Sequence, residues 1–172
     1  MNKIESVSFG VQLKEKEFVH FSLYSQRIAF FVMTIGVALI FIIYFFTLTD
    51  LSFLEITLLS IGIALAVFLP LLIFAVSIKE KKEFRSNYKL REEVFCEVNS
   101  EGVTFSSNNE YSLIEWDQFQ SIKELKDTFL LYQTATKAIV VPKRVFYSEK
   151  DSQLFKTLFS EHMPEEKIHF QK

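Results

Sequence analysis

Two long stretches without Lys, Arg, Asp, Glu or His, at residues 28–49 and 56–78, limit what this chain can fold into. Each stretch matches the roughly 20 apolar residues that a helix needs to cross the core of a bilayer. A core helix of a soluble protein would show a polar stripe at helical spacing, and neither stretch has one. The two stretches therefore predict a transmembrane hairpin over residues 28–78.

The competing interpretation of the first stretch is a cleaved signal peptide. Such a peptide begins with a short basic segment and ends with small residues at the cleavage site. The segment before Ile28 is too long for this, and the apolar stretch lacks a small-residue site. We therefore expect the first stretch to remain as a membrane span.

Charged residues around the hairpin predict its orientation. The link between the spans carries Asp50 and Glu55 but no Lys or Arg, whereas basic residues flank the outer ends of both spans. Basic residues favour the cytoplasmic side, so both termini are predicted to be cytoplasmic. Because Glu80 interrupts the basic run after the second span, we favour a topological role for that run over a lipid-binding patch. The expected membrane-interface anchors are Phe18, Phe21, Tyr24, Arg27, Lys79, Lys81 and Lys82.

Residues 1–27 predict a strand followed by an interfacial helix. Apolar side chains alternate over residues 7–11, as they do in a strand, and we expect this strand to pair with the C-terminal region. Phe18, Phe21 and Tyr24 then recur every three residues, which favours a helix that lies at the membrane interface.

Residues 79–172 predict a separate cytoplasmic domain, which places the whole chain in the α+β class. Short apolar runs alternate with turn residues between positions 94 and 141, which predicts about six strands, the first three of them in a meander. Ser148 lies three residues before Asp151, as in a capping box, and apolar residues follow at helical spacing. A terminal helix should begin there, close the domain and end before Pro164.

The sequence shows no pattern typical of an enzyme or a nucleic-acid binder. Residues 79–172 contain 15 Lys or Arg and 16 Asp or Glu, and this balance disfavours nucleic-acid binding. Cys96 is the single cysteine, which leaves no paired-cysteine zinc site. The three histidines, His20, His162 and His169, are far apart and lack partners at metal-ligand spacing. We expect no catalytic, cofactor-binding or metal-binding residues.

The best candidate for a binding site is the segment that holds Lys143, Arg144, Phe146 and Tyr147. Adjacent basic side chains beside an exposed aromatic ring suit an anionic lipid headgroup or the carboxylates of a protein partner. The alternative is structural: the two basic residues would be solvated or paired with Glu149 and Asp151, and Phe146 would pack at the start of the terminal helix. A further residue, Trp116, is expected in the core.

Several segments together resemble a known family. They are FVHFSLYSQR at residues 18–27, IEWDQFQSIKE at 114–124, FLLY at 129–132 and IVVPKRVF at 139–146. Their order resembles the YcxB-like family, in which a YcxB-like domain follows two membrane helices in bacterial proteins. The resemblance implies a small pleckstrin-homology-like (PH-like) domain, a β-barrel or sheet closed by a C-terminal helix. It implies no catalytic residues, and it places the chain in the bacterial cytoplasmic (inner) membrane.

Three functions follow from these patterns as hypotheses. The leading one is a non-enzymatic membrane-anchored protein that presents its cytoplasmic PH-like module to a protein or to anionic lipid. The alternatives are an immunity protein that protects the membrane against a cognate toxin, and an unrecognised membrane enzyme that uses Cys96 or a histidine. A toxin gene directly upstream would favour the immunity hypothesis. The oligomeric state stays open.

Overall fold

The computed structural model describes residues 6–48, 52–107, 110–135 and 137–171. The chain forms two compact units. One unit contains Met1–Glu17 and Asn87–Lys172, and the other contains Phe18–Ser86. The first unit therefore combines segments from both sides of the apolar stretches, and we call it the α+β unit. The second is the helical unit.

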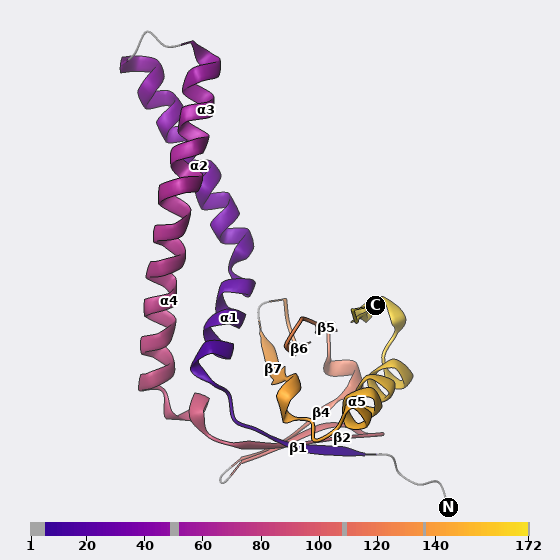
Figure 1. Cartoon of the computed structure of the whole chain (residues 1–172). Coiled ribbons are helices and arrows are strands. Elements are labelled where there is room, and N and C mark those ends of the chain that lie inside the picture. Colours follow the sequence, from indigo (N-terminus) through magenta and orange to yellow (C-terminus); the bar gives the residue numbers. More distant parts are fainter. Residues whose placement is uncertain (1–5, 49–51, 108–109, 136, 172) are drawn as a thin grey trace, which may run out of the picture. The chain divides into compact units, whose positions relative to one another are not determined.

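Long helices form the hairpin of the helical unit (Figure 1). In chain order its elements are α1 (Glu15–Ser25, which begins in the α+β unit), α2 (Arg27–Leu48), α3 (Phe53–Ile63), the π-helical segment η1 (Ala64–Phe68) and α4 (Leu69–Ser86). The ranges Arg27–Thr47 and Phe53–Ser86 are long and apolar enough to cross a membrane. Helices are thus confirmed at both apolar stretches. Asp50, in the link, lies outside the described residues.

The first sheet of the α+β unit is antiparallel and has the order β1-β2-β3-β4. Its strands are β1 (Val7–Val11), β2 (Val94–Asn99), β3 (Gly102–Ser106) and β4 (Tyr111–Glu115). Two predictions are confirmed here: the strand at residues 7–11 pairs with the C-terminal region, with Val11 opposite Val94, and the next three strands form a meander.

The second sheet has the order β7-β6-β5-β8. Its strands are β5 (Ser121–Glu124), β6 (Thr128–Tyr132), β7 (Ala138–Pro142) and β8 (Ile168–His169). β6 pairs antiparallel with β5 and β7, whereas β8 runs parallel to β5. The six strands from β2 to β7 confirm the predicted strand count.

A closed barrel, which the resemblance implied, does not form. β4 pairs with β3, and β5 pairs with β6 and β8, so no ladder joins β4 to β5. Between them the chain makes a 3-10 turn, η3 (Trp116–Gln118), and Phe119 directly after this turn is fully buried. The turn takes the chain into the core instead of into a ladder with β4, so both sheets stay open. The α+β class itself is confirmed.

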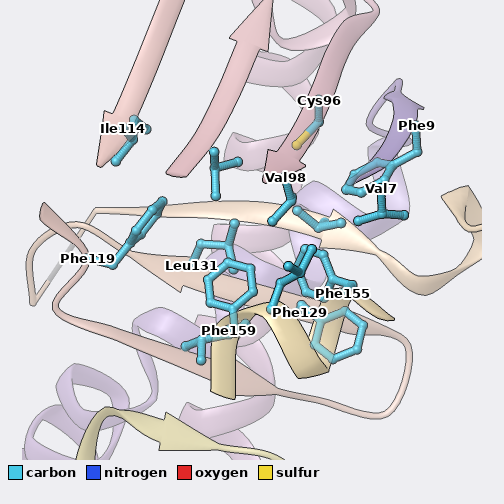
Figure 2. Close-up of a cluster of buried hydrophobic side chains, with 14 of the residues drawn as sticks. Val7, Phe9, Cys96, Val98, Ile114, Phe119, Phe129, Leu131, Phe155 and Phe159 are labelled. Atoms are coloured by element: carbon cyan, nitrogen blue, oxygen red, sulfur yellow. The ribbon is translucent and has the colours of Figure 1, made fainter. Parts of the chain in front are cut away.

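The core of the α+β unit lies where the two sheets and helix α5 (Glu149–His162) meet, as Figure 2 shows. The ring of Phe155 in α5 packs against Phe129 of β6 and Phe9 of β1, with centroid distances of 5.0 and 6.0 Å. Burying a phenylalanine side chain stabilises a protein by about 1.5–3 kcal/mol. These three rings therefore hold α5 to both sheets.

Local chemistry sets the two ends of α5. The Ser148 hydroxyl accepts a hydrogen bond from the Asp151 amide at 3.2 Å, and the Asp151 carboxylate accepts one from the Ser148 amide at 3.0 Å. This is the predicted capping box, and the helix ends at His162, before Pro164, as predicted. Trp116 packs edge-on against Phe159 of this helix at 4.9 Å. It belongs to the margin of the core, as expected.

Gly102 provides a test of the first sheet. It begins β3 with a φ of 149°, and a Cβ at this position would collide with the carbonyl oxygen of Ile114 in β4. Gly102→Ala is therefore expected to lower the free energy of unfolding of the α+β unit by about 1–3 kcal/mol. Trp116 is the single tryptophan, so its fluorescence during denaturant unfolding of the full-length chain measures this change.

The matched control is Gly36→Ala in α2, since a Cβ there would meet nothing within 4 Å. Its unfolding midpoint, followed by the same fluorescence, should equal that of the wild type. An unchanged midpoint for Gly102→Ala would contradict the close approach of β3 and β4.

Candidate binding surface

The four predicted binding residues lie in and directly after η4 (Lys143–Val145), the 3-10 turn that follows β7. The structure gives them different environments. Lys143 and Arg144 form ion pairs within the α+β unit, Phe146 packs against the core, and Tyr147 is 86% exposed.

Lys143 is paired with a buried carboxylate. Its Nζ lies 2.7 Å from Oε1 of Glu124, while Nζ of Lys156 in α5 lies 2.8 Å from Oε2. The amide of Gln171 also donates to Glu124, at 3.0 Å. Burial by itself would raise the pKa of Glu124, but the hydrogen bonds from both lysines and from this amide hold the pKa below its ordinary value. Lys143 therefore connects η4 to β5 and, through Glu124, to α5.

Arg144 forms a bidentate pair with Glu17. Its Nε donates to Oε1 at 2.6 Å, its terminal NH2 donates to Oε2 at 2.9 Å, and the same NH2 donates to the Gln12 carbonyl at 2.7 Å. Burial by itself would raise the pKa of Glu17, but the hydrogen bond from Arg144 outweighs it and holds the pKa below its ordinary value. The guanidinium thus fixes the N-terminal segment against η4.

The partners that the structural alternative named for these basic residues are wrong, whereas its packing of Phe146 is confirmed. Arg144 and Lys143 bond to Glu17 and Glu124 rather than to Glu149 and Asp151, because the Asp151 carboxylate caps α5.

Phe146 lies 4.8 Å from Phe9 and 5.2 Å from Phe155, measured between ring centroids. Its ring packs between β1 and α5, as the structural alternative held, and is half-buried.

The predicted interface anchors lie on the helices of the helical unit. Phe18 of α1 packs against Phe84 of α4 at 5.7 Å, and Phe21 is half-buried. The guanidinium of Arg27 lies over the ring of Tyr24, 4.1 Å from its centroid. The three lysines of the set are exposed on α4: Lys79, Lys81 and Lys82. Their position at a membrane interface stays a prediction.

Glu80 is a residue whose role sequence reasoning missed. Its side chain is buried in the helical unit, where it accepts hydrogen bonds from the Ser22 hydroxyl at 3.0 Å and from the Gln26 amide at 3.5 Å. It therefore joins α4 to the end of α1. In the sequence, Glu80 stands out as a carboxylate within a run of basic residues, and this position predicted only a weaker positive charge of that run.

Cys96 and His162 occupy structural positions. Cys96 is fully buried in β2, and burial raises the pKa of its thiol well above the ordinary value. His162 stacks on Trp116 at 4.9 Å, and its Nδ1 lies 2.9 Å from the Leu158 carbonyl oxygen. Within the described part of the chain, no three His, Cys, Asp or Glu side chains are grouped to hold a metal ion.

A different surface, on the first sheet, exposes apolar side chains. Phe95 of β2 and Tyr111 of β4 are 56% and 74% exposed and lie in one row across the sheet, with Ser106 of β3 between them. Leu113, 38% exposed, lies in the next row. We call Phe95, Tyr111 and Leu113 the outer surface, because their strand neighbours Cys96 and Ile114 point into the core.

Two shallow hollows adjoin the outer surface. The first, of about 360 Å³, is lined by Glu93, Phe95, Ser106 and Ser107. The second, of about 470 Å³, is lined by Tyr88, Lys89, Arg91, Glu92, Val94, Ser107 and Glu110. The hollows meet at Ser107, and exposed aromatic side chains beside them are typical of protein interfaces. The sequence signal was the run VFCEV, in which Phe95 occupies a position that should be polar if one face of the strand meets water.

The ion pair between Glu17 and Arg144 gives a pH-dependent prediction. Glu17→Gln should lower the free energy of unfolding by about 1–3 kcal/mol at neutral pH, because Arg144 loses its charged partner. Folding lowers the pKa of Glu17 below 4.5, so its contribution is present above this value and is lost as the pH falls through the folded pKa. The difference in stability between wild type and Glu17→Gln should therefore shrink in acid.

Trp116 fluorescence in denaturant titrations at several pH values measures this difference. Glu101→Gln, which alters an exposed carboxylate in the turn between β2 and β3, is the matched control and should match the wild type at every pH. A Glu17→Gln difference that stays constant from neutral pH to well below 4.5 would argue against the ion pair.

Comparisons with known proteins add to this geometry. Residues 98–159, which run from β2 to α5 and include segments of both sheets, match the family described as YcxB-like protein. The "Uncharacterized protein YcxB" of Bacillus subtilis (strain 168) is 24% identical over 105 residues, which cover 61% of this chain and 57% of that relative. The match thus spans less than two thirds of the relative's length. No solved structure matches the chain significantly.

The family match contains three of the segments that carried the resemblance, at residues 114–124, 129–132 and 139–146. These segments form the end of β4, η3, β5, most of β6 and the path from β7 through η4, which are the parts that build the second sheet and its ion pairs. The family match over residues 98–159 and the similarity to the Bacillus relative thus confirm the resemblance of this chain to the YcxB-like family.

Proposed function

We propose that this chain is a two-pass membrane protein that holds its α+β unit at the cytoplasmic face of a bacterial inner membrane, as a module that binds another protein. The exposure of the apolar helices carries this proposal. Only 11% of the most apolar 18-residue part of Arg27–Thr47 is buried, and only 6% of the corresponding part of Phe53–Ser86. A core helix of a soluble protein would be largely covered, since exposed apolar surface costs about 25 cal/mol per Å² in water.

The pairing of β1 with β2 supports an even number of crossings. β1 precedes the helical unit and β2 follows it, yet the two strands are in register from Val7 opposite Val98 to Val11 opposite Val94. A chain that leaves one side of a bilayer after β1 must return to that side before β2. This constraint comes from strand pairing alone, and it agrees with the orientation that the basic residues favour.

A protein partner fits the α+β unit better than an anionic lipid does. Lys143 and Arg144, the basic residues that would hold a headgroup, are already bonded to Glu124 and Glu17. The outer surface offers apolar and aromatic side chains instead, the types that are enriched in protein interfaces. Burial of Cys96 supports a binding role rather than thiol chemistry. The PH-like relationship is part of this proposal, supported by two sheets whose common core is covered by α5.

Membrane insertion is tested with single-cysteine variants of the Cys96→Ala chain. Tyr147 is strongly exposed, so in spheroplasts Tyr147→Cys should react with a membrane-impermeant maleimide only after permeabilisation. Asp50→Cys, in the link between the two spans, should react in intact spheroplasts. Recovery of the chain in the soluble fraction, or reaction of Tyr147→Cys from outside, would refute the proposed topology.

Protein binding is tested with the full-length chain, because the first sheet includes β1, which precedes the helical unit in the sequence. A photo-crosslinking residue in place of Phe95 should yield a protein adduct in cells, whereas the same residue in place of the exposed Tyr147 should not. Lipid adducts alone, or no adduct at Phe95, would count against a protein-binding role and leave membrane insertion intact.

A further inference from the structure

We propose that β4 is the docking edge of the α+β unit, where an extended basic segment of a partner protein adds as a fifth strand to the first sheet, beyond its present four. The proposal rests on the proposed function, and it names both the place of binding and the chemistry of the partner. Addition of a strand to a sheet edge is a common mode of peptide recognition, because the backbone supplies affinity and alternate side chains supply specificity.

The free side of β4 presents backbone groups that no strand satisfies. β4 pairs with β3 on one side, and none of the described strands pairs with its other side. The Ser107 amide donates to the Glu110 carbonyl oxygen at 2.9 Å, so the Glu110 oxygen faces β3. Peptide groups alternate in direction along an antiparallel strand, so those of Ser112 and Ile114 face β3 as well.

A second observation gives the same alternation. The carbonyl oxygen of Ile114 lies so close to Gly102 of β3 that a Cβ on this glycine would collide with it. The peptide groups of Tyr111 and Leu113 therefore point to the open side, where an added strand would bond with them. Both residues are exposed.

The other sheet edges are less suitable. β8 has two residues, and β7 is buried along Val140, Val141 and Pro142. β1 leads into Gln12, whose carbonyl oxygen accepts a hydrogen bond from Arg144. Among the described strands, β4 is thus the edge that combines length with exposure.

β4 has few of the features that usually protect an edge, since Glu115 at its end is its single charged residue. Native edge strands are often protected by charged side chains, especially Lys, by Pro, or by a bulge that disturbs pairing. β4 reads YSLIE, without Lys or Pro, and its five residues pair one to one with β3, without a bulge. Such a strand is a template for another strand, which fits a binding role.

The charges around β4 define the partner. A strand added beside it would meet the side chains of Tyr111, Leu113 and Glu115 on the outer surface. Glu115 is exposed and has no ion-pair partner among the described residues. Opposite charges and apolar pairs across strands each stabilise a sheet by about 0.2–1 kcal/mol. The complementary segment therefore carries β-branched or aromatic residues opposite Tyr111 and Leu113 and a Lys or Arg opposite Glu115, at every second position of the added strand.

A second copy of this chain fits less well. Two β4 strands paired antiparallel about Leu113 would place Glu115 opposite Tyr111, so neither copy would bring a cation to the other's carboxylate. We therefore commit to a basic partner segment.

The test selects peptides against the full-length chain in lipid nanodiscs. The probe is a library of random peptides of about twelve residues, long enough to cover one edge strand, and empty nanodiscs remove lipid binders. Enriched peptides should carry Val, Ile, Thr or Tyr at two alternate positions and Lys or Arg at the next alternate position on either side, so that all three side chains share one face. Binding of an enriched peptide should slow amide exchange at Tyr111 and Leu113, whose amides face the open edge.

Three variants locate the binding site. Leu113→Pro removes an amide that points away from β3, so the ladder with β3 is retained and affinity should fall by about tenfold or more. Glu115→Lys reverses a charge on the outer surface and should weaken binding by a similar factor without a change in the backbone. Glu101→Lys reverses an exposed charge in the turn between β2 and β3 and should bind like the wild type. Trp116 fluorescence confirms that each variant is folded.

The outcomes separate this inference from the proposed function. Acidic or unpatterned peptides, the absence of enrichment, or equal binding to folded Glu115→Lys would overturn the β4 edge. A crosslink between two copies at Tyr111 would replace the partner with self-association and overturn it as well. A protein adduct at Phe95 in cells, together with any of these results, would leave the membrane-anchored binding module standing with a different docking site.

Discussion

The pairing of β1 with β2 brings together two segments that the whole helical unit separates in the sequence. It places Phe9 among the core rings of Phe129 and Phe155, so the N-terminal strand contributes to the same core as the C-terminal helix. The bidentate pair of Arg144 with Glu17 fixes the next part of the N-terminal segment. The chain before the helices and the chain after them therefore fold as one body, and any membrane crossing between them must return to its starting side.

Ion pairs between charged side chains of the α+β unit stabilise the fold of this unit. Glu124 is only 5% exposed yet is held by Lys143 and Lys156. A buried carboxylate is costly to desolvate, and two ammonium groups and a backbone amide offset that cost. The adjacent basic residues Lys143 and Arg144 thus form ion pairs with other residues of the same chain. The outer surface and the open edge of β4 instead expose apolar side chains, beside Glu115, which has no ion-pair partner among the residues that the structure describes.

Much of the fold was predictable because it depends on residues close together in the sequence. Uncharged stretches indicated the two long helices, alternation indicated the strands, and Ser148 with Asp151 indicated the start of α5. The open form of the two sheets was not predictable in this way. It depends on η3 and on Phe119, whose burial redirects the chain after β4. No local pattern separates a turn that closes a barrel from one that leaves two sheets.

The sequence by itself determined the class of this protein: two apolar helices within an α+β chain, with local caps and turns that define each element. Tertiary structure alone decided which side chains are exposed and which are paired or buried. Glu17 meets Arg144 across 127 positions of sequence, and Phe146 enters a core that Phe9 helps to form. The reason is physical: helix and strand formation follow interactions within a few residues, whereas exposure and ion pairing depend on which distant segments pack together.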